Sequence, residues 1–537
     1  MGIFIHLDIM PARISREEWK KVYEETLLLV DEYHFMDMII AERNGIQYSY
    51  SRKTQHRDNI FEQGYSGWNS VGDMRTGFNT ENYALFSDIE AYYPETESPD
   101  KGTDILLYAY HDFEWEQGDY CCNIWGNKSQ GKDSHVFLLA IGCLIADRFP
   151  HAAHCYGDIS LGQCRKAIKW ANQYLKTPIQ LPVTANKEIL MKRLKAAEIL
   201  PKEKLLDAFL SLSLEGNGNE IGSFLQQELS DPEIYEYFRK VFSRFSITQM
   251  GFEDRYHQYM EMGFDFKNLC RILITDPEGS KCSPEEFLRF VIKSKLHKLE
   301  KETYDYTKHT SDKPESEEPD DISGLMARVM GRMMGARNHN VDAFYPLEFI
   351  KADCIEIFGD ICDVESLLPS ILDNTGEEKN SVQAMFYDDP NSSFSQFAKE
   401  TEVSRLEKSA AYDIISYEDL IDFTPASKVE PQIDKCLMDN FKKIYTFGQE
   451  KFKKFCSFNR EEREQWFLLR DEYLLLKEDV WNLIFERIME DDYIRRFHAL
   501  FHVDCSLQSG NELCEILFSN VGVIDYYWEK AGMEAAL

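Results

Sequence analysis

The stretch FMDMIIAERNGIQYSY, residues 35–50, decides the fold of the N-terminal part of this chain. Two strand-like runs flank Asn44-Gly45, and this dipeptide supplies the two positive-φ residues that a type I′ turn requires. The stretch therefore predicts a β-hairpin. A strand precedes it, because the odd-numbered apolar residues from Ile3 to Ile9 alternate with the residues between them, which indicates a strand with its core side on the odd positions.

Helix signals are interleaved with these strands over the first 180 residues. Ser15 and Glu18 form a capping box, in which each side chain satisfies a free backbone N–H at the start of a helix. An apolar helix is predicted over Ser134–Arg148, and a short strand over Ala153–Tyr156. Residues Asp104–Glu116 read as a further strand. A mixed fold results, which we expect to be an α/β sandwich-like domain over residues 1–180.

Strand signals thin out after residue 185. Amphipathic helices are predicted for most of residues 185–302, and again over much of residues 322–537. Between them, residues 303–321 contain no aliphatic side chain and many acidic ones, which predicts a flexible hinge. The expected fold class is α+β, with a long and mostly α-helical region after the N-terminal domain.

Composition limits the classes of function. The 537 residues include 60 Lys and Arg against 93 Asp and Glu, giving a net charge of −33. Such a field repels phosphate backbones, so nucleic acid is an unfavourable partner and a basic protein is a better one. The 13 cysteines contain no CxxC pair. Their number is odd, and no secretory signal or membrane span is visible, so we expect a reduced, cytoplasmic protein.

Two candidate sites for chemistry lie on the predicted N-terminal strands. His6 and Asp8 share the face opposite the apolar residues, and a His-x-Asp pair on a strand can hold a divalent metal. Asp112 and Glu114 follow His111 and would form a carboxylate stripe that suits Mg²⁺ or acid/base catalysis. The alternatives are a hydrogen-bonded surface pair and a solvated strand face.

Two further histidine clusters have metal-ligand residue types. His151, His154 and Asp158 match no named zinc spacing, and they also fit a helix C-terminus followed by a turn. His498 and His502 are four residues apart on a predicted helix, but Ala499 replaces the glutamate that zinc proteases use. The surrounding phenylalanines favour packed histidines there.

The clearest binding signal is a methionine-rich segment, Ile322–Ala336. Its apolar face carries flexible side chains that suit adaptable contacts, and arginines lie on the other face. We therefore expect it to contact a partner or another part of this protein, although an ordinary core helix gives the same pattern. The predicted contact residues are Met326, Met330, Met333 and Met334.

These observations favour a protein–protein binding protein, an adaptor or an immunity-like binder, with a helical binding surface and no cofactor. No complete catalytic motif is present, which argues against an enzyme. The alternative is a metal-dependent hydrolase whose divalent metal would sit in the N-terminal domain, provided that its candidate residues converge at one sheet edge.

Overall fold

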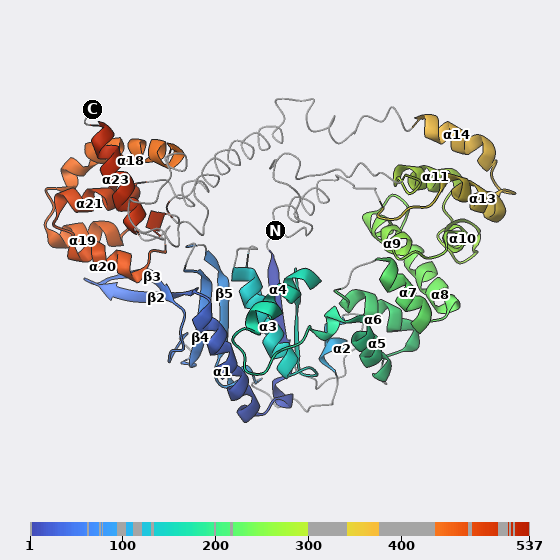
Figure 1. Ribbon diagram of the computed structural model, residues 1–537, viewed down its shortest axis with the longest axis horizontal. Coiled ribbons are helices and arrows are strands. Elements are labelled where there is room, and N and C mark those ends of the chain that lie inside the picture. Colours follow the sequence, from blue (N-terminus) through green and yellow to red (C-terminus); the bar gives the residue numbers. More distant parts are fainter. Residues whose placement is uncertain are drawn as a thin grey trace.

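The computed structural model describes residues 3–61, 64–74, 77, 79–93, 104–110, 121–129, 134–197, 200–214, 218–298, 341–374, 435–470, 475–502, 514, 517–518 and 521–535. The fold is mixed α+β. Seven strands and their helices form the N-terminal part, and the rest of the described chain is helical. In Figure 1 the N-terminal part lies between two helical bodies, formed by the described residues within 183–374 on one side and by those within 435–535 on the other.

The N-terminal part contains two antiparallel sheets, with strand orders β6-β1-β7 and β3-β2-β4-β5. Its elements are β1 (Phe4–Ile9), η1 (Pro11–Arg13), α1 (Arg16–Glu32), β2 (Phe35–Arg43), β3 (Ile46–Lys53), β4 (Gly67–Asp73), β5 (Asn79–Phe86), η2 (Ile89–Tyr92), α2 (Ile105–Ala109), β6 (Cys122–Lys128), α3 (Ser134–Arg148), β7 (Ala153–Gly157) and α4 (Leu161–Ala171).

The predicted hairpin is confirmed as β2 and β3. These strands pair antiparallel from Met36↔Lys53 to Arg43↔Ile46. The turn residues Asn44 and Gly45 have φ values of 54° and 77°, as a type I′ turn requires.

Side chains join the two sheets where β5 lies beside β6. The indole Nε1 of Trp125 on β6 donates to the carbonyl of Ala84 on β5 at 2.8 Å. In the other direction, the hydroxyl of Tyr83 on β5 donates to the carbonyl of Asn127 on β6 at 2.5 Å. Both rings are buried in the N-terminal core, so apolar burial and hydrogen bonding hold the sheets together at the same place.

Helix α3 is the central helix of this core and is buried along most of its length, as its apolar sequence predicts. It contacts β1 and β7 on one side and α1 and α4 on the other. Close approach to β7 depends on Gly142, because a Cβ atom there would lie 2.5 Å from Sγ of Cys155. The predicted capping box at Ser15 and Glu18 is also present.

The predicted strand over Asp104–Glu116 is wrong in its first half, where the chain forms helix α2. The carboxylate of Asp104 accepts a hydrogen bond from the backbone N–H of Leu106 and caps this helix. The apolar run that suggested a strand is instead divided between two cores, with Ile105 in the N-terminal one and Leu106 and Leu107 in the helical one.

The first helical body has one hydrophobic core, which runs from Leu106 to Ile371. Residues 341–374 therefore pack with residues 190–296, although residues 299–340 separate them in sequence. The elements are η3 (Val183–Ala185), α5 (Lys187–Ala196), η4 (Lys202–Lys204), α6 (Leu205–Leu212), α7 (Asn219–Glu228), α8 (Asp231–Phe242), α9 (Met250–Glu261), α10 (Phe266–Cys270), η5 (Arg271–Thr275), α11 (Pro284–Lys293), α13 (Leu347–Phe358) and α14 (Val364–Asn374).

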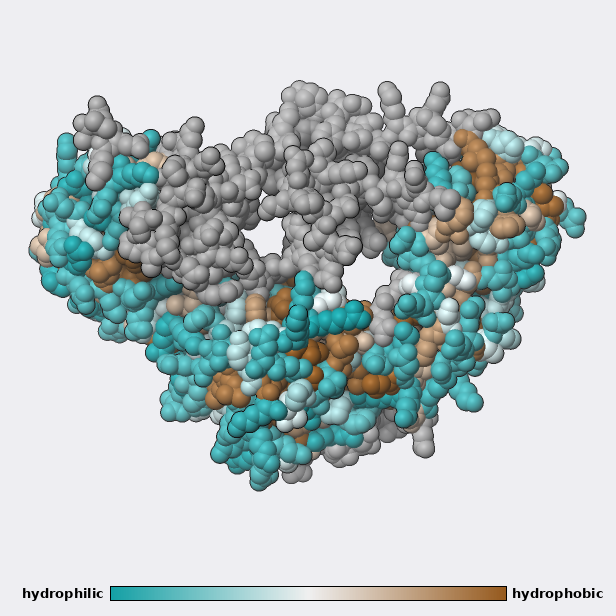
Figure 2. Space-filling model, viewed as in Figure 1, coloured by the Kyte–Doolittle hydropathy of each residue, from teal (hydrophilic) through white to brown (hydrophobic). Residues whose placement is uncertain are grey.

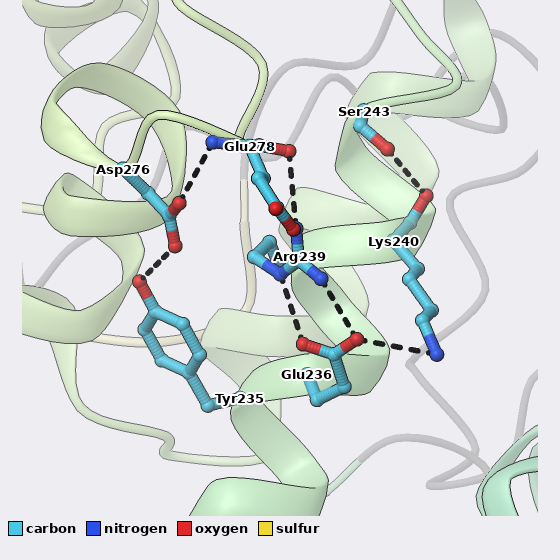
Figure 3. Close-up of polar contacts among 7 residues, drawn as sticks. All are labelled: Tyr235, Glu236, Arg239, Lys240, Ser243, Asp276 and Glu278. Carbon is cyan, nitrogen blue, oxygen red and sulfur yellow. Dashed lines mark hydrogen bonds and ion pairs between the residues drawn. The ribbon is translucent and has the colours of Figure 1, made fainter.

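Polar contacts fix the loop after η5 onto α8 (Figure 3). The Arg239 guanidinium donates two hydrogen bonds to Glu236, at 2.9 and 2.8 Å, and a third to Glu278 at 2.5 Å. The hydroxyl of Tyr235 donates to Asp276 at 2.8 Å. One turn of α8 thus holds the start of this loop.

The second helical body packs against the N-terminal hairpin. Ile46, Tyr48 and Tyr50 of β3 pack against its core. The Trp481 indole donates to the carbonyl of Ser49 at 3.1 Å. Its elements are α18 (Lys435–Phe455), α19 (Arg460–Leu468), α20 (Glu478–Glu486), α21 (Asp491–Leu500) and α23 (Val521–Ala535).

A buried carboxylate also connects the hairpin turn to this body. The Glu464 side chain accepts two hydrogen bonds from Arg43, at 3.0 and 2.9 Å, and one from Asn44 at 2.9 Å. Burial acts to raise the pKa of Glu464, but these donors outweigh it and the pKa is lowered. Across the part of the chain that the structure describes, no helix is long and apolar enough to cross a membrane.

Candidate functional site

The outer face of the sheet β6-β1-β7 brings together three of the sequence-predicted residues. Ile5, Leu7 and Ile9 of β1 are fully buried in the core, so His6 and Asp8 face the other way, as predicted. In the antiparallel register with β7, His6 lies opposite Tyr156 and Asp8 lies opposite His154. His6, Asp8 and His154 therefore share one face.

The carboxylate of Asp8 is almost completely buried and is hydrogen-bonded on both oxygens. Asn123 donates to Oδ1 at 2.6 Å, and the Tyr156 hydroxyl donates to Oδ2 at 3.0 Å. Burial, followed by the charge of Asp8, raises the pKa of Tyr156 well above its usual range. The phenol therefore stays protonated at neutral pH and remains a donor to Asp8.

Four aromatic rings stack in a row on this face. The centroid distances are 5.7 Å from Phe4 to His6, 4.8 Å from His6 to Tyr156 and 5.0 Å from Tyr156 to His154. The ring of His6 fits because Gly157 beside it lacks a side chain. A Cβ atom on Gly157 would lie 3.2 Å from Cδ2 of His6 and 2.6 Å from the carbonyl oxygen of Phe4.

His154 is the row's other titratable group with a strongly shifted pKa. Its side chain is 6% exposed. Burial lowers the pKa of His154 to about 4, and the positive charge of Arg193 acts in the same direction. The imidazole is therefore neutral at pH 7. No hydrogen bond connects its ring nitrogens to the other described residues, so its ring packing is its main interaction.

The other predicted ligands on the N-terminal part have separate partners. His151 is exposed and its Nδ1 lies 2.9 Å from Asp104, a carboxylate that Arg193 also binds through two hydrogen bonds. Asp158 accepts a hydrogen bond from the backbone N–H of Phe4 at 2.9 Å. Both side chains therefore connect neighbouring segments of the backbone.

A metal centre requires several ligand side chains close together. Within the ranges that the structure describes, no three His, Cys, Asp or Glu side chains are placed to hold a metal ion. The predicted stripe at His111, Asp112 and Glu114 lies outside those ranges, and so do Met326, Met330, Met333 and Met334.

The histidine pair of the second helical body lies in an aromatic cluster. The His498 ring stacks on Trp466 at a centroid distance of 4.3 Å and lies 4.7 Å from the His502 ring. Burial lowers the pKa of His498 to about 3, with His502 and Arg470 acting in the same direction. The surroundings of His498 are those of a packed, neutral histidine.

A buried polar cluster in the four-stranded sheet was not expected from the sequence. Asp37 is fully buried, and it receives a hydrogen bond from Asn69 at 3.0 Å and an ion pair from Arg57 at 2.9 Å. Burial raises the pKa of Asp37, although both partners act to lower it. The cluster joins β2, β4 and the loop after β3, which supports a structural role.

An exposed apolar stripe on α13 was also missed. Phe349, Ala352 and Ile355 lie on the exposed side of this helix, and Phe349 and Ile355 are 53% and 40% exposed. Ile350 and Phe358 are buried on the other side. We call the stripe Phe349, Ala352 and Ile355 the α13 face. Figure 2 shows hydrophobic surface gathered at this outer end of the first helical body.

Two more exposed apolar residues extend this surface beyond the helix. Phe344 precedes α13 and is 44% exposed, and Ile361 follows it and is 63% exposed. The sequence does contain a signal for this exposed surface, which is an excess of apolar residues in α13. Residues 347–358 carry more of them than one buried side of a helix can hold, so a second side must carry some to the surface.

Acidic residues outnumber basic ones in and around α13. Residues 341–374 contain eight Asp and Glu residues but only one basic residue, Lys351. Glu356 is paired with Lys267 at 2.6 Å. Glu348 and Asp360 are exposed and form no ion pair with any described residue. The surface therefore combines apolar contact area with two carboxylates that no described basic residue neutralises.

Comparisons with known proteins add no family to this description. No protein-family model matches the chain, and no curated protein or solved structure is significantly similar to it.

Proposed function

We propose that this chain is a protein–protein binding protein whose helical region carries the contact surface. The observation that supports this most directly is the α13 face, an exposed apolar stripe with an acidic surround. Contiguous exposed apolar groups with a polar rim are typical of protein interaction sites. Full burial of an exposed apolar side chain of this size contributes about 1.5–3 kcal/mol, and Phe349 and Ile355 are 53% and 40% exposed, so a partner that covers them gains about half of that from each.

The charge of the surface selects the kind of partner. Glu348 and Asp360 form no ion pair with the described residues, so Lys or Arg side chains of another protein could pair with them. Opposite charges across an interface increase both specificity and association rate. A basic protein is therefore the expected partner. No cofactor is needed for this function.

The test is affinity capture with matched surface variants. The double variant Phe349→Asp, Ile355→Asp should lose a co-purifying basic protein that the unchanged chain retains. Ile189→Asp on α5 is the control, because Ile189 is 51% exposed but lies on another helix. Equal recovery of the same partner by the unchanged chain and the double variant would contradict this role of the α13 face.

A metal-dependent hydrolase is the second candidate, and one observation favours it. His6, Asp8 and His154 share one sheet face, although the described residues complete no metal-binding group there. Metal analysis of the purified protein before and after chelation tests this candidate. A stoichiometric metal that is lost in His154→Ala would support it, and a metal-free protein would count against a tightly held ion.

A further inference from the structure

We infer that the element of the partner that binds the α13 face is a basic amphipathic helix. This inference rests on the proposed function and specifies the ligand of the same surface. Three features support it. They are the spacing of the apolar residues, the carboxylates beside them, and the repulsion that these carboxylates would cause in a contact between two copies of the chain.

The shape of the stripe suits a helix. Phe349, Ala352 and Ile355 are three residues apart, so they form one ridge along the exposed side of α13. A small residue, Ala352, separates two large ones along this ridge. Side chains of a second helix, spaced three and four residues apart, can pack on both sides of such a ridge.

A strand is a poorer ligand for the same surface. Strands bind through backbone hydrogen bonds to an exposed sheet edge. The backbone N–H and C=O groups of α13 are used within the helix itself, because each N–H bonds to the carbonyl four residues earlier. Affinity at this surface must therefore come from side chains, as in helix-in-groove recognition.

The charge of the surface disfavours a second copy of this chain as the occupant. In a two-fold symmetric contact, the α13 face of one protomer would meet the same face of the other. Glu348 and Asp360, which form no ion pair with the described residues, would then approach the same two carboxylates of the second copy. Like charges brought together in this way destabilise the contact.

The same charge favours Lys and Arg along the edges of the binding helix. Glu348 lies on α13 beside the stripe, and Asp360 follows the end of the helix. Both are exposed and unpaired among the described residues. A helix with an apolar side and basic edges would place its cations close to these carboxylates.

The probe is a synthetic peptide of about 16 residues, made of Leu and Lys with apolar residues at helical spacing, because α13 itself spans only about three turns. Binding is measured by fluorescence anisotropy with the full chain, and peptide helicity by circular dichroism. A scrambled peptide of the same composition is the first control. A Leu and Glu peptide with the same spacing is the second.

We expect binding of the Lys peptide with a gain in helicity, and weak or absent binding of both control peptides. Phe349→Asp with Ile355→Asp should weaken binding by about tenfold or more, which is the effect of about 1.4 kcal/mol. Glu348→Lys with Asp360→Lys should also weaken it and reduce its dependence on salt. Ile189→Asp should bind like the unchanged chain.

Several results would overturn the inference. Equal binding of the scrambled peptide, or binding unchanged in the Phe349 and Ile355 variant, would show attraction to the acidic chain in general. Self-association that disappears in that variant would identify a second copy as the occupant. Binding that requires deletion of residues 322–336 would assign the face to that segment of this chain. A captured basic partner that binds without any helix would reject the helix but retain the proposed function.

Discussion

Acidification should destabilise the N-terminal core through His154. The pKa of His154 is lowered to about 4 by burial, against 6.5 for an unperturbed histidine. Protons therefore bind the unfolded chain more tightly than the folded one between these two values. The contribution of neutral His154 to folding stability is therefore complete above pH 6.5 and is lost progressively as the pH falls toward 4.

The magnitude at pH 5 comes from the same two pKa values. Each pH unit below 6.5 costs about 1.4 kcal/mol until the folded state also binds the proton. Stability should therefore fall by about 2 kcal/mol between pH 7 and pH 5 from this residue alone. His135 and His498 are also buried and have lowered pKa values, so the total loss in the unchanged chain should be larger.

The assay isolates His154 by difference. His154→Phe preserves a ring that can stack on Tyr156 but removes the titrating group. Equilibrium urea unfolding at pH 7 and pH 5 should show the variant gaining about 2 kcal/mol relative to the unchanged chain at the lower pH. Phe149→Leu, which alters a buried ring without a titratable group, should show an offset that does not change with pH. An equal pH dependence for His154→Phe and the unchanged chain would refute the reasoning.

Three further predictions follow from close contacts and from exposure. Gly142→Ala should destabilise the chain by about 1–3 kcal/mol, because its Cβ would lie 2.5 Å from Sγ of Cys155. Adding Cys155→Ala should recover part of this loss in urea unfolding. If it recovers nothing, the contact with Cys155 is not the cause of the destabilisation. Glu464→Ala should cost about 1–3 kcal/mol by leaving Arg43 and Asn44 without their acceptor. Since the pKa of Glu464 is lowered, the contribution of its carboxylate to folding stability should be present above pH 4.5 and lost as the pH falls below that value. An unfolding midpoint of Glu464→Ala equal to that of the unchanged chain at pH 7 would contradict the predicted cost. Phe349→Asp with Ile355→Asp should change the free energy of unfolding by less than about 0.5 kcal/mol while partner binding is lost, and a large destabilisation would show that these side chains support the core.

Local patterns in the sequence predicted much of the N-terminal part. Asn44-Gly45 requires a tight turn wherever it lies, since few residues adopt two positive φ angles in succession. The capping box at Ser15 and the alternation over Ile3–Ile9 are equally local. The segment after Asp104 was predicted incorrectly, because an apolar run of that length fits a strand or a short helix. The cap at Asp104 and the division of its apolar residues between two cores decide for the helix.

For the candidate site as well, local sequence predicted one part and contacts between distant segments decided the other. The placement of His6 and Asp8 on one face follows from the period of a strand, so the sequence was sufficient for that pair. Their meeting with His154 and Tyr156 depends on the pairing of β1 with β7, which are separated by more than 140 residues. The α13 face depends on which side of its helix the core covers, and this is decided by α10, η5 and α14.

By itself, the sequence determined the acidic charge, the absence of a complete catalytic motif, the hairpin, and the change from strands to helices. These properties depend on composition or on residues within a few positions of each other. Only the tertiary structure decided that the hairpin enters the second helical body through Glu464 and Trp481, and that one side of α13 remains exposed. Such outcomes depend on contacts between different elements, hundreds of positions apart in the case of the hairpin, and a local pattern carries no information about which other surface will bury it.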